Sequence, residues 1–413
     1  MTGLDQSRRM VVVGASAAGL SAADGLREAG FEGSITVLGS ELHHPYDRPT
    51  LSKGLLLAQG EPELLELRSA ERMEESRIDL ILGRRAVGLD VDRKYVVTDH
   101  GDALPWDAVV LASGGRARPL TTDGGEVLPV LRTPDDLRAL RQGAARHGEV
   151  TVVGAGLIGL EIAAGLSAHG VAVTVLHDTA LPVDRIVGPE LGQVFFELHS
   201  QHGVRLRMLS AVVSVGGVEG DYELRLVDGT IHRTPYVVVG IGVEPDVDWL
   251  EGSGVALSGG VLTDAAGRTN VPGVWAAGDV ARSAHPMFGD PVRVEHWTHA
   301  VEKGRHVGLN AARGTAEPFA GVPYFWSDQF GRRFQSFGRR RDGDTMFVAE
   351  GSLDAEEFLV LFGADGEFHA AFASGQSRSL RGYRKLLARG ARWDEAIDLA
   401  RPANPDLADS VAR

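Results

Sequence analysis

Residues 10–19 read MVVVGASAAG and residues 150–159 read VTVVGAGLIG, and these two similar stretches decide the expected fold. In each, an apolar strand leads into a glycine-rich turn and a helix of small and apolar residues, and a β-branched strand follows at residues 34–38 and 171–176. Both predict a βαβ unit whose turn lets the backbone approach a pyrophosphate at the positive end of a helix. One glycine motif alone is weak evidence, but two framed copies predict two dinucleotide sites.

The predicted phosphate-binding positions are Gly14, Ser16, Ala18 and Gly19 in the first turn and Gly154, Gly156, Ile158 and Gly159 in the second. The first turn departs from the usual pattern, because Ser16 stands where the middle glycine is expected. A serine is compatible with a nearby phosphate if its hydroxyl points away from the phosphate or bonds to it.

A third glycine motif, residues 269–279 (TNVPGVWAAGD), reads as a turn, a short buried strand and the pair Gly278-Asp279. A carboxylate at a strand end can accept hydrogen bonds from the hydroxyls of a ligand. The structural alternative is a turn or a helix N-cap. Beside two dinucleotide folds, we predict that Asp279 binds the ribityl chain of a flavin.

The composition sets limits on the function. A length of 413 residues suggests two or three domains, and no uniformly apolar stretch is long enough to predict a membrane span. Residues 1–10 carry no apolar signal segment, so we expect a cytoplasmic protein. The chain has no cysteine, so its redox chemistry must use a bound organic cofactor. The net charge of −14 argues against nucleic-acid binding.

The C-terminal part, residues 321–413, differs in character from the rest. It contains an aromatic run at residues 324–330 (YFWSDQF), alternating apolar runs at residues 345–349 and 358–362, and a charged stretch at residues 381–392 that predicts a helix. These features predict a small α+β domain.

Four further stretches carry a resemblance to a known family: residues 45–53 (PYDRPTLSK), 112–118 (ASGGRAR), 295–297 (EHW) and 324–328 (YFWSD). With these motifs in order along its whole length, the chain resembles the FAD-dependent ferredoxin reductases of oxygenase systems. That family includes putidaredoxin reductase and the reductases of biphenyl dioxygenases, and it is related to apoptosis-inducing factor. Thr50 departs from the family pattern, which has proline there.

The resemblance implies an α/β fold like that of glutathione reductase, with two Rossmann-like domains and a C-terminal α+β interface domain. The FAD-binding domain would be discontinuous, and the domains would comprise residues 1–118 and 243–320 for FAD, 119–242 for NAD(H) and 321–413 for the interface. The position of Gly278-Asp279 after the second βαβ unit agrees with an FAD domain that resumes there.

The resemblance also implies contacts to FAD. Ser40 or Glu41 would bind the ribose, although Glu41 could instead be a solvated loop charge. Arg48 would pair with the pyrophosphate through its planar donors, and Lys53 would place positive charge near the isoalloxazine. The other positions assigned to FAD are Val87, Arg118, Glu295, His296 and Trp297. A metal held by His296 and His299, three residues apart, is not expected, because no further histidine cluster supports it.

Lys53, Glu161 and Trp326 form the predicted catalytic set. Glu161 lies two residues after Gly159 and could simply complement the helix dipole. The resemblance implies instead that it lies near the nicotinamide and pairs with Lys53. Trp326 would pack at the flavin, and its alternative role is that of a core residue between domains.

The coenzyme preference is predicted from the end of the second strand of the NAD(H) domain. His177 and Asp178 follow this strand, and the first cation after them is Arg185. Asp178 would repel the extra phosphate of NADPH, so we expect NADH. A protonated His177 together with Arg185 would reverse this preference. Ile241 and Gly242 resemble a further contact to the nicotinamide nucleotide.

A flavin links the two-electron donor NADH to a one-electron acceptor. The resemblance therefore implies an NADH-dependent ferredoxin reductase that serves an oxygenase. Two alternatives stay open: an NADH oxidase or diaphorase that uses oxygen or a quinone, and a redox-sensing flavoprotein similar to apoptosis-inducing factor. The oligomeric state, monomer or homodimer, is open as well.

An acidic iron–sulfur ferredoxin would dock on a basic surface. The predicted docking residues lie in a stretch free of acids and are Arg332, Arg333, Arg339, Arg340 and Arg341. A second basic cluster consists of Arg378, Arg381, Arg384 and Lys385. The structural alternative for both is a solvated edge of strands and loops.

Overall fold

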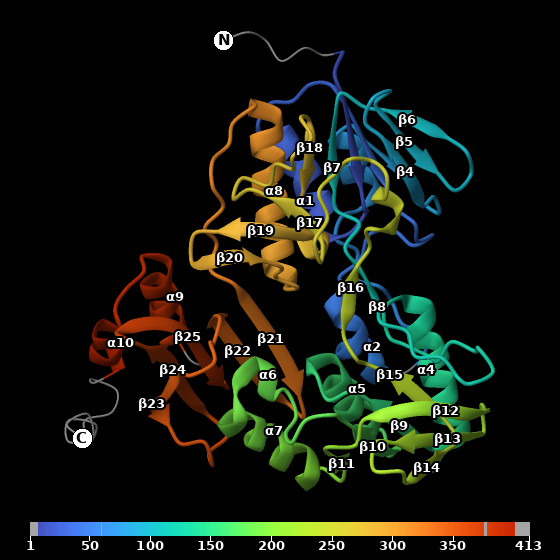
Figure 1. Cartoon of the computed structure of the whole chain (residues 1–413), viewed down its shortest axis with the longest axis vertical. Helices are drawn as coiled ribbons and strands as arrows, with labels where there is room; N and C mark the ends of the chain where they lie inside the picture. Colours follow the sequence, from blue (N-terminus) through green and yellow to red (C-terminus); the bar gives the residue numbers. More distant parts are fainter. Residues whose placement is uncertain (1–6, 59, 376–377, 401–413) are drawn as a thin grey trace. The chain divides into compact units, whose positions relative to one another are not determined.

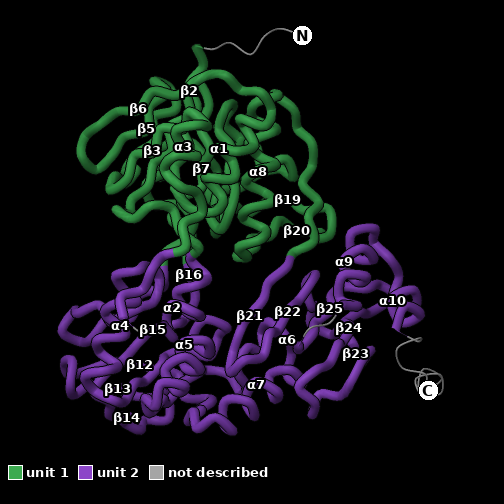
Figure 2. The backbone as a smooth tube through the Cα atoms, turned by 180° about the vertical axis from the view of Figure 1, so that it is seen from behind, with its two compact units in different colours: residues 1–47, 65–116, 244–323 green, residues 48–64, 117–243, 324–413 purple. Residues whose placement is uncertain are grey.

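The computed structural model describes residues 7–58, 60–375 and 378–400. The chain folds as two compact units, which Figure 2 shows in green and purple. Unit 1 comprises residues 1–47, 65–116 and 244–323, and unit 2 comprises residues 48–64, 117–243 and 324–413. The finer division into FAD, NAD(H) and C-terminal domains stays a prediction.

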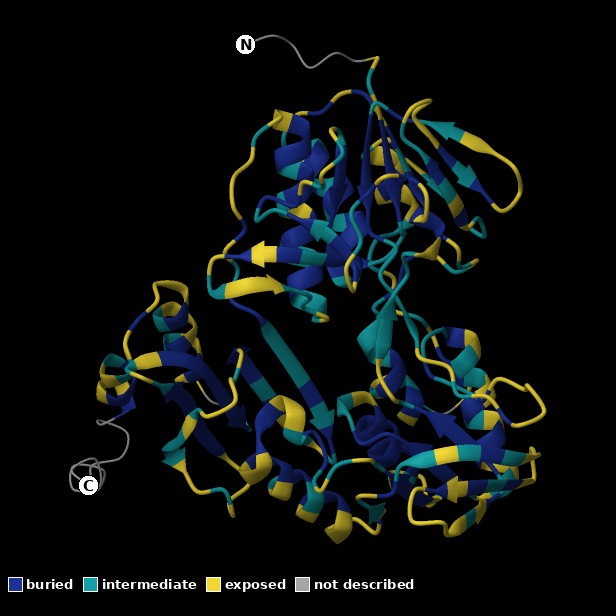
Figure 3. Ribbon diagram, viewed as in Figure 1, coloured by how far each residue is buried: buried dark blue, intermediate teal, exposed yellow. Residues whose placement is uncertain are grey.

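Unit 1 is built on a five-stranded parallel sheet with the order β18-β7-β1-β2-β3 (Figure 1). Its strands are β1 (Arg9–Val13), β2 (Ser34–Leu38), β3 (Ile78–Ile81), β7 (Ala108–Leu111) and β18 (Val274–Ala276). Figure 3 shows that β1 and β7 are largely buried, as expected for parallel strands that are covered on both faces.

The two faces of this sheet have different partners. On one face, Met10 and Val12 pack in a core with helices α1 (Ala17–Glu28) and α8 (Trp297–Arg313). On the other face, Val11 packs in a core with the antiparallel sheet β4-β5-β6 and with the turn η2. The remaining elements of unit 1 are β4 (Ala86–Asp90), β5 (Tyr95–Thr98), β6 (Ala103–Pro105), β17 (Val261–Thr263), β19 (Ala281–His285), β20 (Phe288–Val292), α3 (Ala70–Glu75), η2 (Asp248–Leu250) and η3 (Gly278–Val280).

Glycines set the register of α8 on α1. A Cβ on Gly304 would lie 2.2 Å from the carbonyl oxygen of Ala18, and one on Gly308 would lie 2.1 Å from that of Ala22. These distances are too short for any side chain, so the two helices touch backbone to backbone. The start of α8 is thereby fixed relative to the first glycine turn.

Unit 2 contains a four-stranded parallel sheet with the order β11-β10-β9-β15. Its strands are β9 (Glu149–Val153), β10 (Ala172–Leu176), β11 (Arg205–Arg207) and β15 (Val237–Val239). The elements associated with it are α2 (Gly54–Leu57), α4 (Pro134–His147), α5 (Leu157–Ala168), α6 (Asp184–Val187), α7 (Pro189–Gln201) and the antiparallel strands β12 (Val212–Val218), β13 (Asp221–Leu226) and β14 (Ile231–Thr234). The short turn η1 (Arg48–Ser52) precedes α2, and β8 (Gly115–Ala117) and β16 (Val243–Pro245) lie where the chain passes from one unit to the other.

The C-terminal part of unit 2 is a five-stranded antiparallel sheet with the order β21-β22-β25-β24-β23. Its strands are β21 (Tyr324–Gln329), β22 (Arg332–Gly338), β23 (Thr345–Gly351), β24 (Phe358–Ala364) and β25 (Glu367–Ser374). The helix predicted over residues 381–392 is present as α9 (Leu380–Ala388), but its predicted end is too late. Helix α9 ends before Gly390, whose φ is +65°, and α10 (Trp393–Ala400) begins after it.

Helix α7 packs against the parallel sheet and the C-terminal sheet of unit 2. The Phe195 ring lies 4.4 Å, centroid to centroid, from the Phe334 ring of β22, and His199 bonds to Gln329 of β21. The predicted α/β class, with two parallel sheets of the dinucleotide-binding type and a C-terminal α+β part, is confirmed. Every helix within the described residues is too short or too polar to cross a bilayer.

Candidate functional site

The first glycine turn lies between β1 and α1 in unit 1. Gly14 has a φ of +122°, and a Cβ there would lie 2.0 Å from the carbonyl oxygen of Ala112. A Cβ on Gly19 would lie 1.8 Å from the carbonyl oxygen of Gly14. Within the described residues, the side chain of Ser16, the N-cap of α1, makes no capping hydrogen bond. The Ser16 hydroxyl can therefore meet an anion at the start of the helix.

The second turn, between β9 and α5 in unit 2, repeats this geometry. A Cβ on Gly154, whose φ is +109°, would lie 2.3 Å from the carbonyl oxygen of Gly240, and one on Gly159 would lie 2.1 Å from that of Gly154. Gly156 differs, because a Cβ there would meet no atom within 4 Å among the described residues, and its φ is −74°. The two outer glycines are required by the fold, whereas Gly156 faces open space at the helix N-terminus.

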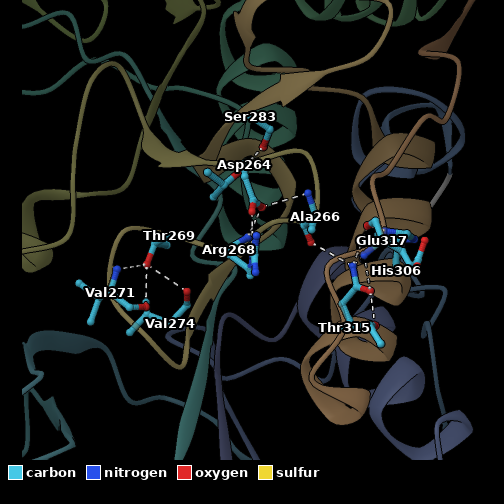
Figure 4. Close-up of polar contacts among 12 residues, drawn as sticks. Asp264, Ala266, Arg268, Thr269, Val271, Val274, Ser283, His306, Thr315 and Glu317 are labelled. Atoms are coloured by element: carbon cyan, nitrogen blue, oxygen red, sulfur yellow. Dashed lines mark hydrogen bonds and ion pairs between the residues drawn. The ribbon is translucent and has the colours of Figure 1, made fainter.

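Asp279 is brought beside the first turn in unit 1. A Cβ on Gly278 would lie 2.7 Å from the Cβ of Ala18, so the Gly-Asp pair adjoins the first turn of α1. Figure 4 shows how the turn that leads into β18 is held: the Thr269 hydroxyl accepts from the N–H of Val271 at 3.1 Å and donates to the carbonyl of Val274 at 3.0 Å. This turn fixes strand β18, which ends at Ala276, three residues before Asp279.

The predicted ribose-binding residues follow β2. Ser40 is exposed, and Glu41 is half-buried. The Tyr46 hydroxyl donates to Oε2 of Glu41 at 2.8 Å, so Tyr46 orients this carboxylate. Tyr46 was not predicted as a site residue, although it lies in the stretch 45–53 that carries the resemblance. Val87, also assigned to FAD, lies on β4 and is exposed.

Glu295, His296 and Trp297 lie at the start of α8. His296 is the N-cap of the helix, and Glu295 forms an ion pair with Arg293. Burial lowers the pKa of His296 to about 4, and burial together with neighbouring positive groups lowers that of His299 to about 2. Both imidazoles are therefore neutral at neutral pH. Among the described residues, no group of three or more histidine or acidic side chains could hold a metal ion.

The predicted catalytic residues lie together in unit 2. Glu161 on α5 is 3% exposed and accepts three hydrogen bonds: from Nζ of Lys53 at 2.8 Å, from Oγ of Ser327 at 2.5 Å, and from Oγ of Ser52. Lys53 also lies 5.8 Å from the ring centroid of Trp326, within the range of a cation–π contact. Ser52 and Ser327 were not predicted.

Arg48 and Arg118 are both placed by backbone contacts in unit 2. The Arg48 guanidinium donates to the carbonyl of Arg132. The Arg118 N–H donates to the carbonyl of Gly242 at 3.0 Å, which brings these two predicted residues side by side. Ile241, next to Gly242, exposes 40% of its surface, and Ile158 in the first turn of α5 exposes 45%. Two apolar side chains thus line the turns at this end of the sheet.

His177 is tied to the second glycine turn. Its Nδ1 accepts the N–H of Ala155 at 3.2 Å, and burial lowers its pKa in spite of the nearby Asp178. The ring is therefore neutral, and the 3.3 Å contact from Nδ1 to Asp178 is not an ion pair.

Asp178 pairs instead with Arg185 at 2.9 Å. Burial raises the pKa of Asp178, but the Arg185 hydrogen bond and the neighbouring groups outweigh burial, and the net shift is downward. Arg185, the first cation that follows this strand in the sequence, is thus bound by a carboxylate.

Most arginines of the first basic cluster, residues 332–341, form ion pairs or hydrogen bonds. Arg333 pairs with Asp328 at 2.7 Å, Arg341 pairs with Glu367 at 3.2 Å, and Arg332 donates to backbone carbonyls and to Ser374. Arg340 is mostly buried and lies 3.6 Å from a carboxylate oxygen of Asp342, and Arg339 is exposed. In contrast, Arg378, Arg381 and Lys385 of the second cluster are exposed and form no ion pair within the described part of the chain.

Comparison with known proteins gives a consistent result. Residues 8–304 match the family described as pyridine nucleotide-disulphide oxidoreductase, and residues 324–407 match the family described as reductase C-terminal. The 3-phenylpropionate/cinnamic acid dioxygenase ferredoxin–NAD(+) reductase component of Photorhabdus laumondii is 33% identical, over 96% of this chain and 100% of that protein.

Two solved structures are similar over nearly the full length. One is the ferredoxin reductase for the CYP199A2 system from Rhodopseudomonas palustris, with a TM-score of 0.89 and 30% identity, covering 96% of this chain and 100% of that chain. The other is the covalent putidaredoxin reductase–putidaredoxin complex, with a TM-score of 0.88 and 28% identity, covering 99% of this chain and 100% of that chain. These similarities confirm the resemblance found in the sequence.

Proposed function

Since the chain belongs to the pyridine nucleotide-disulphide oxidoreductase family, we propose that this oxidoreductase oxidises NADH and passes the electrons singly, through bound FAD, to an iron–sulfur ferredoxin of an oxygenase system. The family implies FAD and a pyridine nucleotide; the preference for NADH and the identity of the acceptor are our proposals. The observation that supports hydride transfer at this chain is the buried pair of Lys53 and Glu161 beside Trp326, in the unit that holds the second glycine turn.

The residues of unit 1 fit FAD. Gly14 and Gly19 allow the tight turn before α1, and the N-terminus of α1, where Ser16 makes no capping hydrogen bond within the described residues, suits a pyrophosphate. Asp279 and Glu41 offer carboxylate oxygens, which suit the hydroxyls of a ribityl chain and a ribose. When bound, FAD supplies the ability to take two electrons from a hydride donor and to release them one at a time.

The residues of unit 2 fit NADH better than NADPH. The open space at Gly156 suits the pyrophosphate of the coenzyme at the start of α5. Beyond it, Asp178 is a carboxylate suited to the 2′-hydroxyl of a ribose, His177 is neutral, and Arg185 is engaged by Asp178. A 2′-phosphate would meet the negative charge of Asp178 at this position, and Arg185 is already paired with that carboxylate.

Glu161 would lie near the nicotinamide end of the coenzyme, and Lys53 and Trp326 would lie near the flavin ring. The ammonium of Lys53 is held by Glu161 and would supply fixed positive charge where negative charge develops on the reduced flavin. Glu161 is kept in one orientation by its three donors. Trp326 presents an aromatic face that excludes water from the reacting groups.

The chain cannot run the disulfide exchange that the family's description names. It contains no cysteine, so no thiol can accept or relay electrons. The relative from Photorhabdus laumondii is described as a ferredoxin–NAD(+) reductase component, and one similar structure is a complex of a reductase with putidaredoxin. We therefore assign a ferredoxin as the acceptor.

We place the docking of an acidic ferredoxin mainly on α9 and the residues just before it. Arg378, Arg381 and Lys385 are exposed cations without a described acidic partner, so their charge acts at a distance. Arg333 and Arg341 of the first cluster are ion-paired, so they contribute less to the field of this surface. Arg339 adds an exposed charge on the same C-terminal part.

The proposed acceptor is tested by comparing two rates at the same NADH concentration. One is the anaerobic reduction of a purified iron–sulfur ferredoxin, and the other is oxygen consumption without ferredoxin. We expect ferredoxin turnover to exceed oxygen consumption by at least roughly tenfold. Oxygen or quinone reduction that is as fast as ferredoxin reduction would assign the protein to NADH oxidases or diaphorases instead.

A further inference from the structure

We propose that Ser327, Gln329 and His199 form a buried hydrogen-bonded relay that positions the carboxylate of Glu161, and through it the ammonium of Lys53, for hydride transfer. The three are positioning residues, because none of them belongs to the set that would touch the coenzyme. The inference rests on the proposed function, since it assigns a role in that reaction to side chains outside the predicted site.

The relay is continuous over three elements of unit 2. Oγ of Ser327 on β21 donates to Oε1 of Glu161 at 2.5 Å, and Nε2 of Gln329 donates to Oγ of Ser327 at 2.9 Å. Oε1 of Gln329 lies 2.8 Å from Nε2 of His199 on α7. Ser327, Gln329 and His199 are at most 1% exposed, so water does not compete for these bonds.

The donors can be ordered in only one direction. The carboxylate of Glu161, which is paired with Lys53, accepts from Ser327, so Ser327 gives it its one proton and must accept from the amide of Gln329. The amide oxygen of Gln329 then faces His199, whose Nε2 must carry the hydrogen. Every donor in the relay therefore points toward Glu161, an arrangement in which each bond polarises the next.

His199 is suited to end this relay. Burial lowers its pKa to about 4, so the ring is neutral at neutral pH and carries a single hydrogen. With that hydrogen on Nε2, Nδ1 is bare, and Nδ1 has no hydrogen-bond partner within the described residues. The imidazole ring packs edge-on against the Phe330 ring, with 5.0 Å between the ring centroids, and this contact fixes the plane of the imidazole.

The relay orients both oxygens of Glu161. Oε1 is held by Ser327, and this leaves Oε2 for Lys53 and Ser52. Without the hydroxyl of Ser327, the carboxylate can rotate, and the ammonium of Lys53 moves with it. A displacement on the order of 1 Å at a reacting group lowers a rate by up to about 100-fold.

The test is rapid-mixing reduction of the FAD-loaded protein by NADH under anaerobic conditions. Variants Ser327→Ala and His199→Leu break the relay at its two ends, while Ser327→Thr and His199→Gln keep a donor at each position. Ser336→Ala is the matched control, because Ser336 is a buried serine of the neighbouring strand β22 that makes no hydrogen bond to Glu161 in the described structure.

We expect the limiting rate of flavin reduction to fall about 10-fold or more in Ser327→Ala and His199→Leu, with the NADH concentration at half saturation changed less than threefold. The donor-keeping variants should recover most of the rate. A lower melting temperature with an unchanged limiting rate would show that the relay only stabilises the fold, and an equal loss in Ser336→Ala would also overturn the proposal. If the variants at one end of the relay do not fold, the two variants at the other end decide the test. Failure of the proposed function is distinct, because the unmodified protein would then not be reduced by NADH.

Discussion

Nζ of Lys53 lies 2.8 Å from Oε2 of Glu161, although 108 residues separate the two in the chain. Their side chains are 16% and 3% exposed, so the pair is largely removed from water. Removing one partner of such a pair leaves a buried charge without compensation, which typically costs about 3–5 kcal/mol for a fully buried pair.

The first prediction follows from this pair. Lys53→Met should lower stability by up to about 3 kcal/mol and slow flavin reduction at least roughly tenfold, while the protein keeps its FAD. The double variant Lys53→Met/Glu161→Gln removes both charges, so it should recover stability without recovering the rate. Thermal unfolding and anaerobic flavin bleaching measure the two effects. If the double variant recovers the rate of flavin reduction together with its stability, the pair of Lys53 and Glu161 serves folding alone.

The second prediction separates two glycines of one turn. Gly159→Ala should unfold or strongly destabilise the protein, because its Cβ would lie 2.1 Å from a backbone oxygen. Gly156→Ala meets open space at a normal φ, so its melting temperature should be within a few degrees of the original. It should nevertheless raise the KM for NADH at least roughly fivefold, since the methyl group occupies the place of the pyrophosphate. An unchanged KM for NADH in Gly156→Ala would show that the coenzyme does not bind at this turn.

The third prediction concerns the choice of coenzyme. Asp178→Asn removes the carboxylate that engages Arg185, so the ratio of kcat/KM for NADPH to that for NADH should rise about tenfold, equivalent to about 1.4 kcal/mol. Adding Arg185→Ala in the same background should cancel the gain. The ratio is measured by steady-state kinetics with each coenzyme. If this ratio of kcat/KM values is unchanged in Asp178→Asn, the ribose of the coenzyme does not lie at Asp178.

The fourth prediction tests the docking surface on α9. Arg381→Glu/Lys385→Glu should lower kcat/KM for an acidic ferredoxin about tenfold or more at low salt, and the effect should shrink at high salt. Arg313→Glu/Arg225→Glu reverses two exposed charges outside this surface and is the control. Flavin bleaching by NADH should stay unchanged in both. Equal losses in the two double variants, or no dependence on ionic strength, would contradict steering by α9.

The sequence was sufficient for the two dinucleotide-binding folds because their constraints are local. Gly14 and Gly154 adopt φ values that favour glycine, and the strands beside them are apolar runs whose bounds follow from the pattern, such as Ser34–Leu38. The break between α9 and α10 is local as well, because it lies at Gly390, but the charges on both sides of this glycine continue a helical pattern and conceal the break.

The surroundings of Glu161 depend on tertiary structure. The proximity of Lys53 was expected only from the resemblance, and nothing in the spacing of the residues brings Ser327 or His199 to the same place. The basic cluster is a similar case. Arg333 lies in a stretch without acids, but the β21–β22 hairpin sets Asp328 directly opposite it. Such pairings come from register and packing, and a linear count of charges does not contain them.

The central claim is that NADH reduces a flavin bound to this chain, and that a one-electron acceptor reoxidises it. Anaerobic titration of the purified protein with NADH, followed by addition of oxidised ferredoxin, tests this claim most directly. We expect a yellow protein whose flavin absorbance is bleached by NADH and restored by ferredoxin. A protein that is colourless and stays colourless after incubation with FAD, or a flavin that NADH does not bleach, would contradict it.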